Sequence, residues 1–369
     1  MDALVTAAEA GDLGRVRAAI AAGADVNAVY VADRERYTAL MRAADAGHLQ
    51  VADELLKAGA SPDQSGLDRT LTAGITPLML AARAGHTAVV KRLLEAGARP
   101  GIQQVDLLSL VMGPKRERGR PLDAAIHEAA AAGHAEIVKL LVEAGAKPDD
   151  KSGASGTVLE AAAASGDKQT LEAVFSAKGQ NRQKAGVSVQ ALIAAVESGD
   201  RENVRTLIES GANANARTRR GDTALASAAA NGDTDIVKLL LEAGARPSTG
   251  LGRNPLNGLM LAASSGYRDI VQLLLDAGAN VDEQGADGET ALHWAVTNAH
   301  AEVVETLLKA GASMAIRNEE GKTPLQSVRQ IISAWSGRNR HPLVGELTNL
   351  EAYRRCVKLL ERAGKIRKQ

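Results

Sequence analysis

Aromatic side chains are scarce in this sequence of 369 residues. Phe, Trp and Tyr together make up 2% of it, whereas 45% of the residues are hydrophobic. Ala, Leu and Val therefore supply most of the apolar share, and these small or branched side chains suit close packing between helices. The composition predicts a core made of closely packed helices.

Cysteine is nearly absent as well, and the sequence has no net charge and no long apolar run. The one cysteine, Cys356, excludes an internal disulfide framework and is typical of a reducing compartment. Lys plus Arg and Asp plus Glu both number 44, so the surface has no bulk attraction for nucleic acid or anionic lipid. We expect no membrane insertion, because no apolar run is long enough to span a bilayer. We also expect a monomer in the cytoplasm, with a periplasmic or secreted location left open if a signal peptide was removed before Met1.

Two phased glycines run through the whole sequence. The first recurs at steps of 36, 38, 48, 33, 33, 33, 34 and 33 residues, with an alanine at its last position, and a second glycine usually follows twelve residues later. The first set is Gly11, Gly47, Gly85, Gly133, Gly166, Gly199, Gly232, Gly266 and Ala299. Such a period indicates a repeat architecture of nine units, followed by a modified tenth.

The third unit shows how one repeat should fold. Thr76 can cap a helix that Pro77 begins, and Gly85 can end that helix in the left-handed conformation. A second helix follows, with an apolar stripe that includes Val89 and Leu93, and Gly97 ends it. One such pair cannot bury both of its faces, so the units must stack.

These residues resemble the ankyrin repeat. The resemblance rests on segments such as Thr76-Pro77-Leu78, Thr290-Ala291-Leu292-His293, Ile236-Val237-Lys238-Leu239-Leu240-Leu241 and Gly23-Ala24-Asp25-Val26-Asn27. It implies an all-α ankyrin-repeat solenoid of stacked helix-turn-helix units with hairpin fingers, and a concave binding surface made by inner helices and fingers. We expect no sheet beyond the finger hairpins.

We expect one ankyrin-repeat domain over residues 1–369. Its units lie at about 1–28, 29–64, 65–101, 119–149, 154–180, 187–216, 218–248, 253–283, 285–316 and 318–366, with a finger insertion at 101–119 and a further insertion at 337–349. In the tenth unit Ala352 stands at the register of the turn glycine. The fifth and sixth units are degenerate, which indicates either a weak point in the stack or a drifted repeat.

Residues that could carry chemistry fall at structural positions. His48, His86, His134 and His300 follow the turn of their units, where we expect hydrogen bonds to adjacent turns, and only His127 and His341 have no assigned place. Cys356 aligns with an apolar position of a second helix, which favours the core over a nucleophile. No catalytic or metal-binding motif is present. We therefore expect no enzyme activity, no cofactor and no metal.

Nucleic acid binding is also disfavoured. Basic clusters occur at 115–120, 217–220 and 362–368, but they are far apart in the repeat order and almost free of aromatic residues. Solvated surface is the better interpretation of these clusters, and we expect another protein as the partner.

Candidate partner-binding residues come from three places. In this family the positions before each turn point toward the groove, and tyrosine, tryptophan and arginine are favoured at interface hot spots. The candidates in the groove and fingers are Tyr30, Arg34, Tyr37, Arg42, Asp45, Arg83, Glu197, Trp294 and Asn298. Packing against the next unit is the alternative for Trp294.

The finger insertion at 101–119 supplies the remaining candidates, Leu107, Leu108 and Arg116. The step between turn positions is 15 residues longer here than the standard step. The first part of the insertion carries seven large apolar side chains. Either this part packs back on neighbouring fingers or it is a partner-binding hot spot. The resulting hypothesis is a protein-binding scaffold or adaptor, with a regulatory or inhibitory, immunity-like subunit of an enzyme or channel as the alternative.

Overall fold

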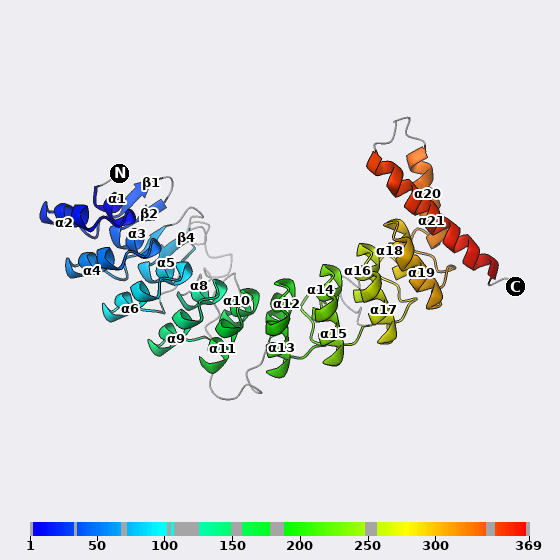
Figure 1. Cartoon of the computed structure of the whole chain (residues 1–369), viewed down its shortest axis with the longest axis horizontal. Coiled ribbons are helices and arrows are strands. Elements are labelled where there is room, and N and C mark those ends of the chain that lie inside the picture. The colour runs from blue at the N-terminus through cyan, green and yellow to red at the C-terminus, as the bar shows by residue number, and fades with distance from the viewer. Residues whose placement is uncertain are drawn as a thin grey trace, which may run out of the picture. The chain divides into compact units, whose positions relative to one another are not determined.

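The computed structural model describes residues 3–32, 35–67, 72–101, 105–106, 125–148, 157–177, 188–247, 257–336 and 344–366. The chain divides into an N-terminal unit, residues 1–186, and a C-terminal unit, residues 187–369, each made of helix pairs (Figure 1). The helices of the N-terminal unit are α1 (Ala3–Glu9), α2 (Leu13–Ala21), α3 (Ala39–Asp45), α4 (Leu49–Lys57), α5 (Pro77–Ala84), α6 (Thr87–Glu95), α8 (Ala125–Ala131), α9 (Ala135–Glu143), α10 (Val158–Ala164) and α11 (Lys168–Ala177).

Five further pairs make up the C-terminal unit. They are α12 (Val189–Glu197), α13 (Arg201–Glu209), α14 (Ala224–Asn231), α15 (Thr234–Glu242), α16 (Gly258–Ser265), α17 (Arg268–Asp276), α18 (Ala291–Thr297), α19 (Ala301–Lys309), α20 (Pro324–Ser336) and α21 (Val344–Ile366). In both units the first helix of each repeat packs on the first helix of the next, and the second helices form a parallel outer row. The all-α repeat fold expected from the sequence is thereby confirmed.

The ends of the helices follow the local chemistry of the repeat. Thr76 Oγ1 accepts a hydrogen bond from Met79 N (3.3 Å), Pro77 occupies the first turn, and Gly85 ends α5 with φ of 82°. Ala299 takes the same left-handed conformation, with φ of 62°, at the one turn where glycine is absent. The core between the helices consists of the repeated Leu, Val, Ile and Ala positions.

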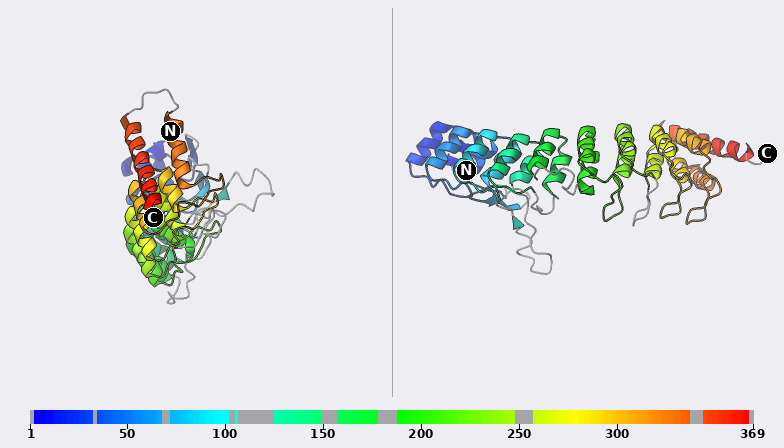
Figure 2. Two further views of the ribbon diagram at one scale, coloured as in Figure 1. Left: turned by 90° about the vertical axis from the view of Figure 1, so that its right-hand side faces the viewer. Right: turned by 90° about the horizontal axis from the view of Figure 1, so that it is seen from below.

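The fingers of the N-terminal unit form a continuous antiparallel sheet, which we did not expect beyond isolated hairpins. Its strands are β1 (Tyr30–Ala32), β2 (Glu35–Tyr37), β3 (Gly66–Leu67), β4 (Thr72–Ile75) and β5 (Val105–Asp106), in that order. Figure 2 shows these strands to one side of the helices. The fingers join where Arg36 pairs with Leu67, and a Cβ at the neighbouring Gly66 would collide with the carbonyl oxygen of Arg36.

A side chain from each of several repeats closes over the turn of the preceding repeat. His48, His86, His134 and His300 donate from Nε2 to the carbonyl oxygens of Glu9 (3.0 Å), Asp45 (3.0 Å), Arg83 (3.2 Å) and Ser264 (2.9 Å). Each of these acceptors lies two residues before a turn position. The expectation that these histidines bond the adjacent turns is confirmed.

A second set of bonds links the fingers. Asn27, Asp63, Asn215 and Asp282 lie four residues after the second glycine of their repeats, and each accepts a hydrogen bond from a backbone N–H of the next repeat, at 2.7 to 2.9 Å. The third repeat has Gly101 at this position. No such side chain is available there, and this is where the expanded finger begins.

Repeat 10 departs from the expected pattern. Ala352 lies inside α21, a continuous helix of 23 residues. The expectation of a turn at Ala352 is therefore wrong. Residues 344–349, which we expected to belong to an insertion, form the first part of this helix. Tyr353 nevertheless takes the place of the turn histidine, since its hydroxyl donates to the carbonyl oxygen of Thr297 at 2.9 Å.

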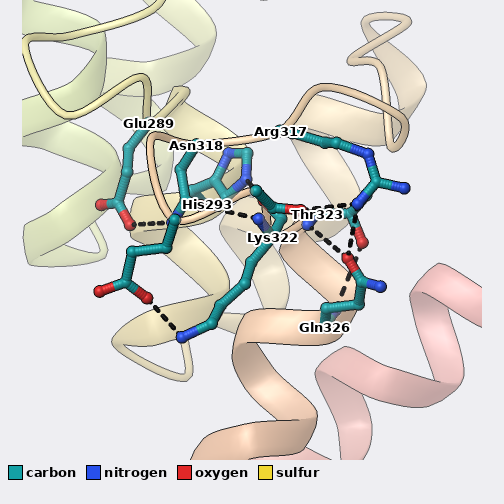
Figure 3. A network of polar contacts seen from close by, with 9 residues as sticks. Glu289, His293, Arg317, Asn318, Lys322, Thr323 and Gln326 are labelled. Carbon is teal, nitrogen blue, oxygen red and sulfur yellow. Dashed lines mark hydrogen bonds and ion pairs between the residues drawn. The ribbon is translucent and has the colours of Figure 1, made fainter.

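His293 is the centre of a buried polar network between repeats 9 and 10 (Figure 3). Its Nδ1 accepts from Thr290 N (3.2 Å) and its Nε2 donates to the carbonyl oxygen of Lys322 (3.1 Å), which fixes the neutral tautomer. Burial lowers the pKa of His293 below its usual value of 6.5. Gln326 holds the corresponding place in repeat 10, where its Oε1 accepts from Thr323 N at 2.9 Å.

Replacing Gly47 with Ala should destabilise the protein more than replacing Gly59 with Ala. Both glycines have positive φ, 78° and 91°, so each substitution costs roughly 1–2 kcal/mol of backbone strain. Only at position 47 would the new Cβ meet the His86 ring, at 2.6 Å, which adds about 1–3 kcal/mol. Urea unfolding followed by circular dichroism measures the difference, and equal losses in the two variants would refute the turn contact.

The stability of the C-terminal unit should fall as pH drops below 6.5. In that range the unfolded chain protonates position 293 while the folded chain keeps it neutral, so protons favour unfolding until the pH passes the lower folded pKa. His293→Gln keeps an acceptor for Thr290 N, as Gln326 does for Thr323, but cannot titrate. Unfolding free energies measured from pH 5 to 7 should therefore depend less on pH in the variant than in the unaltered protein. Identical pH profiles would contradict this role.

Candidate interaction surface on the inner helices

Charged side chains link the inner helices of the first three repeats. Arg42 Nη1 lies 3.8 Å from Glu9 Oε1, and Arg83 Nη2 lies 3.6 Å from Asp45 Oδ1. The side chains of Asp45 and Arg83 are 36% and 47% exposed, so this pair adds little stability and remains open to a partner. We call Glu9, Arg42, Asp45 and Arg83 the inner-helix surface.

The backbone beneath this surface is held by the next repeat. The carbonyl oxygens of Glu9, Asp45 and Arg83 are the acceptors of His48, His86 and His134. The same three residues thus bond a neighbouring repeat through the main chain and present a charged side chain to solvent. Such an arrangement favours recognition, because little backbone conformational entropy remains to be lost when a partner binds.

Tyr37, expected in an exposed finger, belongs to the core and is withdrawn as a contact residue. It is 6% exposed and clusters with Met41, Ile75 and Leu80. The ring also lies beneath Arg42, whose Cζ is 4.1 Å from the ring centroid. Tyr37 precedes the helix cap Thr38, and a side chain at this position packs back on the helix.

Of the other finger candidates the structure describes Tyr30, which lies in β1 at the edge of the sheet. Tyr30 is half-buried on β1, beside Val29 and Val31, which are 40% and 68% exposed. Arg34 lies outside the described residues, as do Leu107, Leu108 and Arg116 of the insertion. The insertion enters the description at Val105 and Asp106, which pair with Ala73 and Thr72 of the preceding finger. This pairing places the start of the insertion on a neighbouring finger.

Candidates in the C-terminal unit form two separate groups. Glu197 is exposed at the end of α12, without an ion pair among the described residues. Asn298 donates from Nδ2 to Trp294 O (2.9 Å) and to Ser264 Oγ (3.3 Å), so it connects repeats 8 and 9. Trp294 is half-buried, and its Nε1 is shielded from solvent without a hydrogen bond among the described residues.

Cys356 is fully buried, as the sequence indicated, and burial raises the pKa of its thiol to about 11. Within the part of the chain that the structure describes, no group of three or more His, Cys, Asp or Glu side chains could hold a metal ion. Among the described helices, none is both long and apolar enough to cross a membrane.

Two contact residues, Tyr267 and His127, were not expected from the sequence although their register in the repeat marks them. Tyr267 follows Gly266 as the histidines follow their glycines, and a Cβ at Gly232 would lie 2.7 Å from its ring. His127 precedes Gly133 by six residues, as His293 precedes Ala299, and it is likewise buried at 4% exposure. Tyr267 was missed because a tyrosine stands where other repeats have histidine. His127 was missed because repeat 4 starts irregularly.

Comparison with known proteins agrees with this geometry. No curated protein matches the chain. A family model described as ankyrin repeats (3 copies) matches residues 1–66, 63–152, 159–250 and 259–328. These matches cover most of the chain and both of its units. The chain therefore belongs to the ankyrin-repeat family.

Proposed function

We propose that the protein is a scaffold or adaptor that binds a partner protein through the inner helices and fingers of its N-terminal unit. Ankyrin repeats are generally protein-interaction modules. The observation that carries the proposal is the inner-helix surface, where half-exposed charged side chains are presented by backbone that the next repeat holds in place. The cytoplasmic location and the monomeric state stay predictions.

Charge complementarity is the expected basis of this recognition. Glu9, Arg42, Asp45 and Arg83 alternate in sign across three inner helices. Such a pattern selects a partner whose charges alternate in the opposite sense, and it penalises partners with like charges in those places. Val29 and Val31 add exposed apolar area at the neighbouring finger.

Exchanging the two charges of one pair tests this proposal. The double variant Asp45→Arg with Arg83→Asp keeps an ion pair between α3 and α5 but inverts its direction, so stability should change by less than about 0.5 kcal/mol. Binding of the partner should weaken at least about tenfold, or about 1.4 kcal/mol. The matched control is Lys139→Glu on the exposed side of outer helix α9.

The measurement has two steps. Quantitative mass spectrometry first identifies a protein from the source organism that co-purifies with the unaltered chain and with the Lys139 variant, but not with the exchanged pair. Its dissociation constant is then measured with all three purified chains. Equal affinity for the three would place the interface elsewhere. An enzyme or channel as the partner, with altered activity in the complex, would favour the regulatory-subunit alternative.

A further inference from the structure

The last helix of the C-terminal unit is longer than its position in the repeat requires. Helix α21 has 23 residues, whereas the outer helices α13, α15, α17 and α19 have nine each. Helices α17 and α19 start directly after Tyr267 and His300, the residues whose rings lie against the preceding turn glycine. In α21 the corresponding residue is Tyr353, so residues 344–352 form an extension before the usual starting point. Figure 1 shows α21 running along α20 and beside α19.

A cavity of about 970 Å³ lies between this helix and the turns of repeats 8 and 9. One side is the turn of repeat 9, from Ala299 to Val303, and the other side carries Arg354, Arg355 and Lys358 of α21. These three basic side chains are exposed, and none of them makes an ion pair or hydrogen bond within the described part of the chain. Two carboxylates, Glu302 and Glu351, line the same cavity.

A smaller cavity of about 240 Å³ adjoins the first. It lies between α20 and α21, with Ile332 and Val357 as its apolar residues, and it shares Arg354 and Lys358 with the larger cavity. The two basic side chains therefore stand between a space of mixed polar and apolar lining and a mainly apolar one. A ligand that uses both spaces needs negative charge next to a large apolar group.

Two cations on the neighbouring helices have carboxylate partners, unlike the three basic side chains of the cavity. Arg329 of α20 bonds Glu361 at 2.7 Å, and Lys309 of α19 bonds Glu305 at 2.8 Å. Lys309 lowers the pKa of Glu305, and the positive charge of Arg355 lowers this pKa by a smaller amount. Arg354, Arg355 and Lys358 thus supply positive charge that no carboxylate of the described chain takes up in a direct pair.

We propose that this face of α21 is a second docking surface, which binds an acidic segment of a partner protein. Carboxylates of the segment lie against Arg354, Arg355 and Lys358, and one large apolar side chain enters the space between Ile332 and Val357. The surface lies on the C-terminal unit and uses no residue of the inner-helix surface, so either proposal can fail without the other.

The mixed lining favours a polypeptide over a nucleic acid. Glu302 and Glu351 repel phosphates and carboxylates alike, but they can accept hydrogen bonds from the backbone N–H groups that a peptide presents at nearly every residue. Among the described residues no Phe, Tyr or Trp lines either cavity, and the ring of His300 is held against the turn of repeat 8 by its bond to the carbonyl oxygen of Ser264. A nucleic acid also has no large aliphatic side chain that could fill the apolar space next to its charges.

Fluorescence anisotropy with the full chain and short labelled probes tests the proposal. The first probe is a peptide with six Glu around a central Leu, the second has Gly in place of that Leu, and the third is a single-stranded oligonucleotide of equal charge. At about 50 mM salt, where charge screening is weak, the Leu peptide should bind with a micromolar dissociation constant. The Gly peptide and the oligonucleotide should each bind at least threefold more weakly.

The triple variant Arg354→Glu, Arg355→Glu, Lys358→Glu should bind the Leu peptide at least tenfold more weakly. The control Lys139→Glu, Arg219→Glu, Lys238→Glu changes the net charge by the same amount at exposed sites elsewhere, and it should bind as the unaltered chain does. A milder variant with Gln at positions 354, 355 and 358 should also lose affinity, with a thermal unfolding midpoint that stays unchanged. Any of three results would overturn the proposal: an equal loss of affinity in the Glu variant and its control, no binding of the Leu peptide, or tighter binding of the oligonucleotide.

Discussion

The contact between one repeat and the turn of the repeat before it is the interaction on which the rest of the structure depends. In five of these contacts a ring lies against a turn glycine, so closely that a Cβ would stand 2.5 to 2.7 Å from it. Four of the five rings are histidines that also bond a backbone carbonyl oxygen. Stability in a repeat protein is the sum of such nearest-neighbour terms, so the small residue at the turn matters as much as the apolar core.

The same contact connects stability with function. The carbonyl that a histidine bonds belongs to the residue whose side chain faces solvent on the inner helices, as Asp45 and Arg83 show. Packing thereby fixes the main chain of the surface that we propose as the binding site. The last repeat makes a similar contact with different residues, because Tyr353 bonds the carbonyl oxygen of Thr297. The same helix, α21, lines the neighbouring cavity with basic side chains that have no ion pair among the described residues.

Most of the repeat could be predicted from the sequence, because its determinants are local. Thr76, Pro77 and Gly85 specify one helix from its cap to its end, and the phase of the glycines specifies the stacking. The finger sheet could not be predicted in this way, since it depends on the close approach of Arg36 to Gly66 across two fingers. Tyr37 was misjudged as exposed for a related reason. Its burial requires Ile75 and Leu80 of the next repeat, although its place directly before a cap residue was a usable sign.

Hydrogen exchange of the complex with its partner tests the central claim most directly. The claim is that recognition uses the surface that the turn contacts hold in place on the inner helices. Binding should slow amide exchange in α1, α3, α5 and the adjoining fingers, and leave α2, α4 and α6 of the same repeats unchanged. Protection confined to those outer helices, with the inner helices exchanging as in the free protein, would contradict the account.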